Sequence, residues 1–221
     1  MSALLARVGA LCVCTLLAAT AALAQHGTPH MHQRFQDAER WSKIFVDPAR
    51  EAWQKPAEVL RVLALAPDAA VADIGSGTGY FAVRLARAVP RGRVYGADLE
   101  PDMVRFLNER AAKERLPNLA SHEAAPDDPR LPAPVDLVLV VDTYHHIGDR
   151  ERYFGRLREA LKPGGRVAII DFKPDSPVGP RSGRIPAAQV NAEMARAGYR
   201  LPVEHEFLPY QFFLVFEAAA R

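Results

Sequence analysis

The stretch Val71–Phe81, VADIGSGTGYF, places three glycines within five residues directly after an apolar run. An acidic residue, Asp73, stands two positions before the first glycine. Glycine lets a chain turn sharply, and it lets a ligand approach backbone that a Cβ would shield. A buried strand that leads through such a turn into a helix is typical of cofactor-binding α/β proteins. The stretch therefore predicts a ligand site at the end of a strand in a parallel sheet.

The chain around this stretch alternates between apolar strands and amphipathic helices up to residue 172. Segments rich in Val and Leu, such as residues 135–141, are typical of parallel strands that are covered on both faces. Two further strands between residues 199 and 218 are joined by a short turn at Pro209, so they must pair antiparallel. We therefore predict an α/β fold: a Rossmann-like, doubly wound, mostly parallel seven-stranded sheet with a C-terminal antiparallel β-hairpin.

Residues 1–24 have the layout of a secretory signal peptide. One positive charge, Arg7, precedes the apolar run Val8–Ala24, which ends in a small-x-small sequence. We expect cleavage after residue 24 and export, most simply to the periplasm, with no stable membrane insertion of the mature chain. The run is marginal in length for a membrane span, so an uncleaved anchor is one alternative. A start at Met31, with a cytoplasmic product, is another.

Residues 25–55 are predicted to form a polar leader and a helical cap, ahead of a main domain over residues 56–221. The pair Asp47-Pro48 is typical of the start of a helix. We expect the cap to cover the ligand site, with Trp53 and Gln54 as lid residues.

Composition narrows the classes of partner. The formal net charge is +2, and the basic residues alternate with acids rather than forming a continuous stripe, so we expect no nucleic-acid partner. Both cysteines, Cys12 and Cys14, lie in the predicted signal peptide. The mature chain would then have no thiol for a disulfide, a metal site or nucleophilic catalysis. A small-molecule substrate is left by elimination.

The acids near the glycines indicate the charge of the ligand. The spacing is GxGxG rather than the dinucleotide pattern GxGxxG, and Asp73 would repel a pyrophosphate. An acid is useful where the ligand carries a positive charge. Asp98 follows at the end of the second predicted strand, where a carboxylate can accept both hydroxyls of a ribose. The alternative role for Asp98 is to cap the helix that begins at Pro101.

Four segments, residues 71–81, 94–104, 135–147 and 157–172, together resemble the class I S-adenosylmethionine-dependent methyltransferases. The resemblance covers residues 56–221 and extends to the antiparallel end of the sheet. It implies that the cofactor is S-adenosyl-L-methionine and that the activity is methyl transfer. These motifs do not identify the molecule that accepts the methyl group.

The resemblance also assigns positions around the cofactor. Asp73 and the glycine loop would face the methionine part, Asp98 would hold the ribose, and Leu99 would flank the adenine. Ala125 stands where the family often has an acid for the adenine amino group, so either Asp127 or Asp128 would substitute or the contact is missing. The expected cofactor-binding residues are Asp73, Gly75, Ser76, Gly77, Gly79, Asp98, Leu99, Asp127 and Asp142.

Candidate catalytic residues follow the fourth predicted strand. Tyr144, His145 and His146 lie there, and a histidine titrates near neutrality, as a general base should. A base is needed only if the acceptor must lose a proton, and the alternative is that the histidines pack under and cap the next helix. A metal site would need a third ligand, such as Asp171 or His205, and we predict none.

Two other functions fit parts of the pattern. An NAD(P)-binding oxidoreductase would use a similar turn, but the GxGxG spacing and Asp73 disfavour it. A catalytically silent S-adenosylmethionine-binding protein is the other alternative, because the predicted export would separate the protein from a cofactor made in the cytosol.

Overall fold

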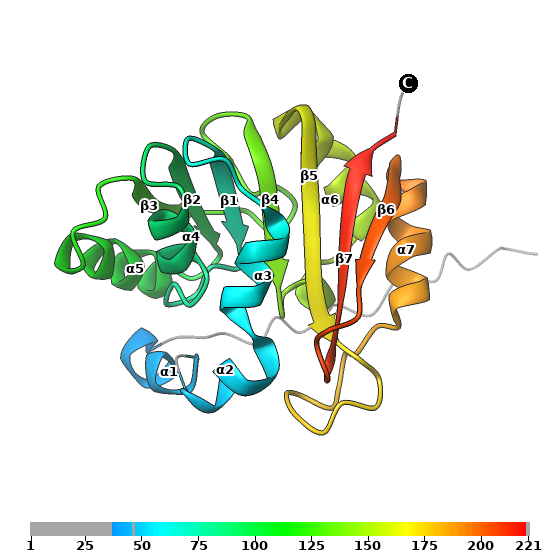
Figure 1. Ribbon diagram of the computed structural model, residues 1–221, viewed down its shortest axis with the longest axis horizontal. Helices are drawn as coiled ribbons and strands as arrows, with labels where there is room; N and C mark the ends of the chain where they lie inside the picture. The colour runs from blue at the N-terminus through cyan, green and yellow to red at the C-terminus, as the bar shows by residue number, and fades with distance from the viewer. Residues whose placement is uncertain (1–36, 46, 220–221) are drawn as a thin grey trace, which may run out of the picture. The chain divides into compact units, whose positions relative to one another are not determined.

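A computed structural model describes residues 37–45 and 47–219 of the chain, so the predicted signal peptide and both cysteines lie outside the described residues. The described chain contains a seven-stranded sheet with the strand order β3-β2-β1-β4-β5-β7-β6 (Figure 1). The strands are β1 (Ala70–Ile74), β2 (Arg93–Asp98), β3 (Leu119–Glu123), β4 (Val135–Val141), β5 (Leu161–Phe172), β6 (Tyr199–His205) and β7 (Gln211–Ala218).

The direction of the strands confirms the predicted fold class. Strands β1 to β5 pair parallel with their neighbours, whereas β7 pairs antiparallel with both β5 and β6. The C-terminal hairpin is thus inserted beside β5, with β7 between β5 and β6.

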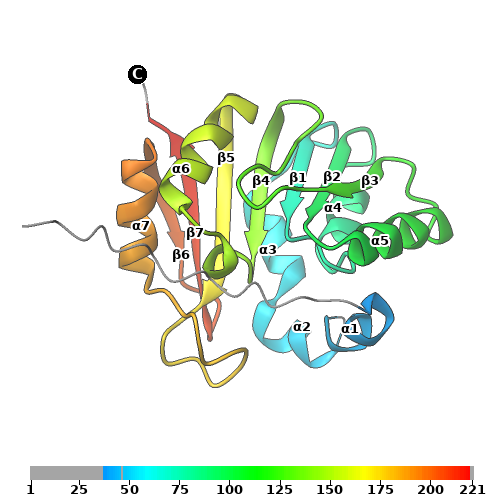
Figure 2. The same ribbon diagram turned by 180° about the vertical axis from the view of Figure 1, so that it is seen from behind.

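Helices cover both faces of the sheet (Figures 1 and 2). Side chains from α3, α4 and α5 share one buried cluster, and side chains from α6 and α7 share the other. The helices are α1 (Ala38–Phe45), α2 (Ala49–Gln54), α3 (Pro56–Leu63), α4 (Ala82–Ala88), α5 (Pro101–Lys113), α6 (Arg150–Leu157) and α7 (Ala187–Arg196), with 3-10 turns η1 (Tyr144–His146) and η2 (Arg158–Ala160).

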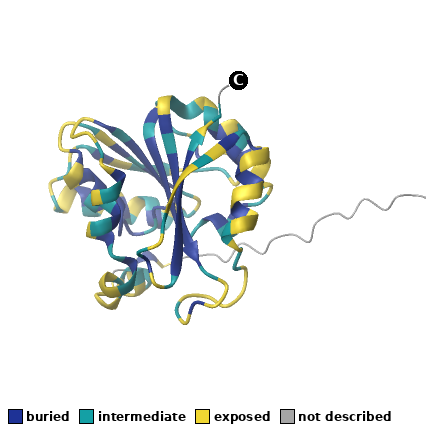
Figure 3. Cartoon of the chain, turned by 45° about the vertical axis from the view of Figure 1, so that its right-hand side comes forward, coloured by how far each residue is buried: buried dark blue, intermediate teal, exposed yellow. Residues whose placement is uncertain are grey.

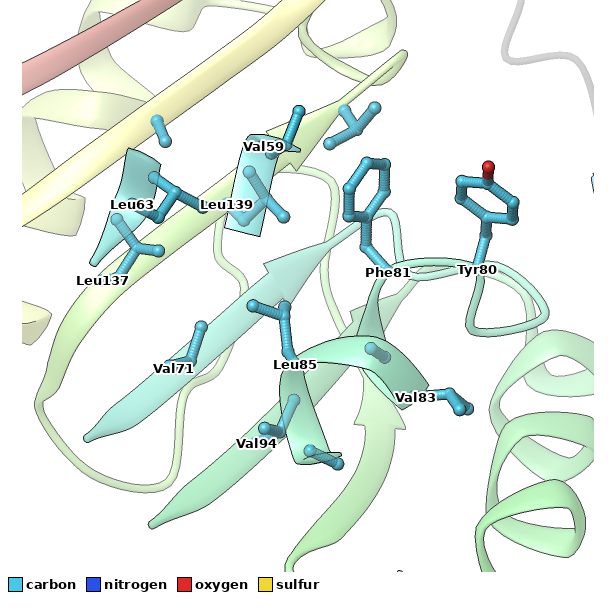
Figure 4. Close-up of a cluster of buried hydrophobic side chains, with 14 of the residues drawn as sticks. Val59, Leu63, Val71, Tyr80, Phe81, Val83, Leu85, Val94, Leu137 and Leu139 are labelled. Atoms are coloured by element: carbon cyan, nitrogen blue, oxygen red, sulfur yellow. The ribbon is translucent and has the colours of Figure 1, made fainter. Parts of the chain in front are cut away.

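Alternation along the strands divides the core between these two faces. In β4, Leu137 and Leu139 belong to the cluster under α3, whereas Val138 and Val140 belong to the cluster under α6 and α7. Figure 4 shows Leu137 and Leu139 on the same side of the sheet as Leu63. Burying an aliphatic side chain of this size contributes about 1.5–3 kcal/mol. Exposed residues concentrate on the outer sides of the helices and in the loop after β5 (Figure 3).

One boundary differs from the prediction. The sequence pattern predicts a helix up to residue 161 and a strand from residue 165, but α6 ends at Leu157 and β5 begins at Leu161. Leu161 pairs with Val135, and the register then shifts before the next pair. A Cβ on Gly165 would lie 3.0 Å from the carbonyl oxygen of Val135, so glycine allows this close approach.

The carboxyl ends of the parallel strands meet helices α1 and α2, which lie beyond that edge of the sheet in Figure 1. The start of α2 fits its sequence, because the Asp47 carboxylate accepts a hydrogen bond from the backbone N–H of Ala49 at 2.8 Å. Within residues 37–45 and 47–219, no helix has the length and hydropathy needed to cross a bilayer.

Candidate cofactor and acceptor site

The glycine loop between β1 and α4 needs its glycines for shape. Gly75, Gly77 and Gly79 have φ angles of +71°, +51° and +88°, in the left-handed region that other residues rarely adopt. A Cβ on Gly75 would lie 2.2 Å from the Thr143 hydroxyl oxygen, and one on Gly79 would lie 2.3 Å from a Leu107 methyl carbon. The loop therefore packs tightly against both β4 and α5.

Two carboxylates border this loop, Asp73 buried and Asp98 partly buried. Asp73 is 4% exposed, and its pKa is raised to about 7, first by burial and then by the negative charge of Asp98. Burial also raises the pKa of Asp98. Neither carboxylate forms an ion pair with another side chain in the described part of the chain. Two adjacent acids without a cation fit a ligand that brings positive charge.

The backbone fixes the orientation of Asp98. Its Oδ2 accepts a hydrogen bond from the N–H of Gly77 at 2.8 Å, and its Oδ1 accepts one from the N–H of Glu100 at 3.0 Å. The second bond resembles the capping alternative, but α5 itself begins after Glu100. Each carboxylate oxygen can accept more than one hydrogen bond, so Asp98 can still accept ribose hydroxyls.

Hydroxyls in the loop add further polar groups. The hydroxyl oxygens of Ser76 and Thr78 are buried and have no hydrogen-bond partner among the described residues. Buried polar atoms are normally hydrogen-bonded, so unpartnered hydroxyls beside two acids are suited to a polar ligand.

Helices α1 and α2 lie against the same loop. The Phe45 ring is 3.5 Å from the position that a Cβ on Gly77 would occupy. The guanidinium of Arg50 lies 4.3 Å from the centre of the Tyr80 ring, and that of Arg84 lies 4.1 Å from it. Arg84 also forms an ion pair with Glu51 of α2. The helical cap therefore contacts the glycine loop directly.

At the end of β4, Asp142 contacts the cap rather than the glycine loop. Its carboxylate forms an ion pair with Arg50 at 3.2 Å and accepts hydrogen bonds from the amides of Gln54 and Gln211. Burial raises the pKa of Asp142 to about 6, although Arg50 acts in the opposite direction, and the charge of Asp171 raises it further. A direct role of Asp142 in cofactor binding stays a prediction.

His145 and Asp171 form a second polar pair at this edge. The Nδ1 atom of His145 is 2.9 Å from both carboxylate oxygens of Asp171, and the His145 backbone N–H donates to Asp171 Oδ2 at 3.2 Å. The Nε2 atom of His145 is buried, and no group in residues 37–45 or 47–219 forms a hydrogen bond with it. Burial alone would lower the pKa of His145, but Asp171 and Asp142 raise it above the ordinary value. This arrangement places a proton on Nδ1 and leaves Nε2 of the neutral ring as an acceptor.

The structure does not bring every predicted residue to this edge. Tyr144 is fully buried in the cluster under α6 and α7, and its hydroxyl donates to Glu193 at 2.7 Å, so this geometry does not fit a catalytic role. Asp127 is exposed and forms an ion pair with Arg156 at 3.1 Å. Leu99 is 43% exposed beside Asp98, and the His146 ring lies 4.1 Å from that of His145.

The sequence does not predict Arg50 or Gln211 as site residues, and it offers Asp171 only as a possible metal ligand. Asp171 lies next to the end of an apolar strand, and that position is a usable signal, whereas nothing local distinguishes Arg50 or Gln211. Across residues 37–45 and 47–219, no group of three or more His, Cys, Asp or Glu side chains is arranged to hold a metal ion.

Comparisons with known proteins agree with this site. A family model described as "Methyltransferase domain" matches residues 71–165, which include the glycine loop, β4 and η1. The demethylmenaquinone methyltransferase of Thermus thermophilus is 31% identical over 138 residues, covering 61% of this chain and 55% of that protein. The arsenite methyltransferase of Halobacterium salinarum is 29% identical over 155 residues, covering 62% and 38%. The chain thus matches about half or less of the length of these relatives.

Solved structures give the same result. An S-adenosylmethionine-dependent methyltransferase from Aquifex aeolicus has a TM-score of 0.74 at 26% identity, covering 81% of this chain and 97% of that one. Magnesium protoporphyrin IX methyltransferase from Synechocystis, solved with bound S-adenosylhomocysteine, has a TM-score of 0.62 at 18% identity, covering 82% and 94%, which shows a shared fold. Residues 71–165 thus match a methyltransferase domain, and the fold is similar to that of S-adenosylmethionine-dependent methyltransferases, which supports the class I family that the sequence motifs predicted.

The residues present fit the cofactor of this family. S-adenosylmethionine carries a positive sulfur and an amino group, and the two unpaired carboxylates Asp73 and Asp98 supply the complementary charge. The buried hydroxyls of Ser76 and Thr78 supply unused polar groups in the same loop.

Proposed function

We propose that this protein transfers a methyl group from S-adenosylmethionine to a small molecule. The observation that carries the proposal is the pair Asp73, which is buried, and Asp98, which is partly buried, at a glycine loop with no cationic side chain beside them in the described chain. An oxidoreductase that bound NAD(P) here would have to place a pyrophosphate against this negative charge, which is unfavourable.

The chain's own residues would mainly bind and align the reactants. The cofactor supplies a methyl group on a positively charged sulfur, which leaves as a neutral thioether. Asp73 and the loop of Gly75, Gly77 and Gly79 would hold the methionine part, and Asp98 would hold the ribose. The cap formed by α1 and α2 would exclude water from the reacting groups.

His145 is the residue best placed to accept a proton from the acceptor. Asp171 holds its Nδ1 atom at 2.9 Å, and the buried Nε2 atom has no hydrogen-bond partner in the described part of the chain. This favours an acceptor whose oxygen or nitrogen must lose a proton before or during methylation. His146 is the second candidate, since its ring lies beside that of His145.

The identity of the acceptor cannot be transferred from relatives. The matched proteins act, by their names, on acceptors as different as demethylmenaquinone, arsenite and trans-aconitate. Arsenite is disfavoured here, because residues 25–221 contain no cysteine to bind it. A small organic acceptor without a nucleic-acid component is the class that we propose.

We also propose that the protein is exported through the signal peptide predicted over residues 1–24. Export would place the enzyme apart from cytosolic S-adenosylmethionine, which keeps the alternative of a silent binding protein open to test. The mass of the mature N-terminus after cell fractionation decides between cleavage after residue 24, an uncleaved anchor and a start at Met31.

Calorimetric titration tests the function itself. We expect S-adenosylmethionine and S-adenosylhomocysteine to bind and NADH not to bind. The Asp98→Ala protein should lose about a hundredfold in affinity, because two hydrogen bonds to a charged acceptor are lost. Glu151→Ala is the matched control, since Glu151 is an exposed acid of α6 that pairs only with Arg196. Tight NADH binding without cofactor binding would contradict the proposal.

Activity separates an enzyme from a silent binding protein. A panel of small hydroxyl and amino compounds, with S-adenosylhomocysteine formation as the readout, should include at least one acceptor. His145→Gln should then lower kcat far more than it lowers cofactor affinity. Asp171→Asn should shift the pH profile of kcat, because it changes the group that orients His145. Cofactor binding with no turnover on any compound would favour the silent binding protein.

A further inference from the structure

A buried polar cluster joins helix α2 to two strands of the sheet. It consists of Arg50 and Gln54 from α2, Asp142 from the end of β4 and Gln211 from the start of β7, and we name these four residues the clamp. Gln54 and Gln211 are fully buried, and the side chains of Arg50 and Asp142 are 15% and 22% exposed. Residues from three separate elements therefore meet in one polar cluster.

Every member of the clamp contacts other members. The Gln54 amide donates to Asp142 at 3.1 Å and to the side-chain oxygen of Gln211 at 3.2 Å. The Gln211 amide donates to the other oxygen of Asp142. Arg50 donates through Nε to Gln54 at 2.8 Å and through another nitrogen to Asp142 at 3.2 Å. Removing one partner from a buried ion pair of this kind leaves an uncompensated charge.

Every nitrogen of the Arg50 guanidinium donates to an acceptor within the protein. The remaining terminal nitrogen of Arg50 donates to the carbonyl oxygen of Phe45 at 2.6 Å, so every nitrogen of this guanidinium is in use. The other charged groups near Asp142 are Asp171 of β5 and His145 of η1, which contact each other. The contacts of Arg50 are thus internal to the protein, and they fix where α2 lies.

The fixed position of α2 covers the mouth of the proposed site. Arg50 stacks on Tyr80 at the end of the glycine loop, and Trp53 contacts Phe172 at the end of β5, with ring centres 5.9 Å apart. Figure 1 shows α2 below the carboxyl ends of β1 and β4, and the contact of Trp53 with Phe172 connects it to the end of β5. A cofactor held by the loop would have to pass this helix to enter or leave.

We propose that the clamp holds α2 closed over the cofactor and that its release controls how fast the cofactor exchanges. Arg50, Gln54 and Gln211 are positioning residues in this view, and Asp142 is their common acceptor. The inference rests on the proposed cofactor site, but the position of α2 can be measured without any ligand.

The two tryptophans of the chain make α2 directly observable. Trp53 lies in α2 and Trp41 lies in α1, so a Trp41→Phe background leaves a single reporter on the clamped helix. In this background Arg50→Ala should raise the acrylamide quenching constant of Trp53 severalfold at pH 7. The rate of S-adenosylhomocysteine release, followed by stopped-flow displacement, should rise by about tenfold, which corresponds to about 1.4 kcal/mol.

Matched variants separate the clamp from general destabilisation. Arg196→Ala removes an exposed arginine whose partner is Glu151, on the far side of the sheet, and it should leave both readouts unchanged. Arg50→Lys keeps the charge but loses the fork of donors, so it should restore part of the closed state. Gln54→Leu keeps the side-chain volume approximately and supplies a milder test if Arg50→Ala does not fold.

The outcomes of the two proposals can be told apart. If the wild-type protein binds no S-adenosylhomocysteine, the proposed function fails, while Trp53 quenching still tests the clamp. If the ligand binds but folded Arg50→Ala and Gln54→Leu proteins show wild-type release rates and quenching, the clamp does not hold α2 and the inference is overturned.

Discussion

Two pairs of aspartates lie at the same edge of the sheet, and they differ in their partners. Asp73 and Asp98, on β1 and β2, have no cationic side chain beside them in the described chain. After β4 and on β5, Asp142 forms an ion pair with Arg50, and Asp171 accepts a hydrogen bond from Nδ1 of His145. Each pair has one buried and one partly buried member, so the difference lies in whether the protein supplies a partner side chain. We propose that the first pair meets the positive charge of a ligand, whereas the second pair is satisfied by the protein's own side chains.

The two pairs would therefore have different roles in the proposed site. A buried carboxylate without a cationic partner has a raised pKa before a cationic ligand binds, as Asp73 does. A carboxylate that already has its partners holds other groups in position, as Asp171 holds the ring of His145 and Asp142 holds α2. The region around Asp73 and Asp98 is therefore expected to gain stability when the cofactor binds. The region around Asp142 and Asp171 is expected to be stable without a ligand.

The largest effect on stability is expected at Asp142, in the pair whose partner side chains the protein supplies. Asp142→Ala should lower the free energy of unfolding by about 3 kcal/mol, because Arg50 would keep a buried charge without its partner. Urea unfolding at pH 7, followed by circular dichroism, measures this loss. An Asp142→Ala protein as stable as wild type would remove the proposed difference between the two pairs.

Substitution of Asp73, in the pair without a cationic partner, should instead raise the free energy of unfolding. The folded-state pKa of Asp73, about 7, lies above its unfolded value, so the folded state binds a proton that the unfolded state has released. Its contribution to stability is fully present below about pH 4 and is lost as the pH rises through 7. Asp73→Asn has no such loss, so without ligand it should gain on wild type by about 2–3 kcal/mol between pH 5 and pH 8.

Urea unfolding at several pH values tests this gain, and Asp136→Asn is the control. Asp136 is an aspartate at the opposite end of the sheet that pairs with Lys162, and its pKa is lowered rather than raised. The difference between Asp136→Asn and wild type should therefore not grow in favour of the variant above pH 5. If Asp73→Asn showed no pH-dependent gain, Asp73 would not be a carboxylate waiting for a cation.

Ligand binding gives a smaller effect of the same origin. A cationic ligand lowers the pKa of Asp73, so binding below pH 7 must release a proton, and affinity should fall as the pH drops. The fall for S-adenosylmethionine should approach, at most, about tenfold per pH unit between pH 7 and pH 5.5. Calorimetry in two buffers of different ionisation enthalpy measures both the affinity and the proton release. The Asp73→Asn protein should bind more weakly, with a flatter pH profile.

Sequence reasoning predicted Asp73, Asp98, Asp142 and His145 as site residues. It did not predict the partners Arg50 and Gln211, for a physical reason. Asp73, the glycines and Asp98 lie in short local patterns tied to strand ends, where the fold class fixes their neighbours. Arg50 and Gln211 reach Asp142 from 92 and 69 positions away, so only the tertiary structure brings them together. Arg50 lies on a short helix outside the repeating strands and helices, and nothing in its local sequence points to Asp142.

Local geometry also explains why the residues after β4 were hard to separate. Tyr144 and His145 are neighbours in the 3-10 turn η1, and their side chains point to different environments. The turn sends Tyr144 into the core under α6 and α7, where Glu193 accepts its hydroxyl, and sends His145 toward Asp171. Because a one-residue step decides between core and site, composition alone could not distinguish the two. The periodicity of strands, which extends over many residues, was readable.

The smallest expected effect is that of Leu99, which lies next to Asp98, on ligand affinity. Leu99 follows Asp98 directly and is 43% exposed, so its side chain is accessible to a ligand beside Asp98. The resemblance places it against the adenine. Leu99→Ala should leave the free energy of unfolding within about 0.5 kcal/mol of wild type, since little buried surface is lost. Its affinity for S-adenosylhomocysteine should fall by about fivefold, corresponding to about 1 kcal/mol of apolar contact.

Val203→Ala, at a similarly exposed position on the edge strand β6, is the control and should change neither the free energy of unfolding nor the affinity. Equal affinities for the Leu99→Ala and Val203→Ala proteins would show that the ligand does not extend from the two acids over this side chain.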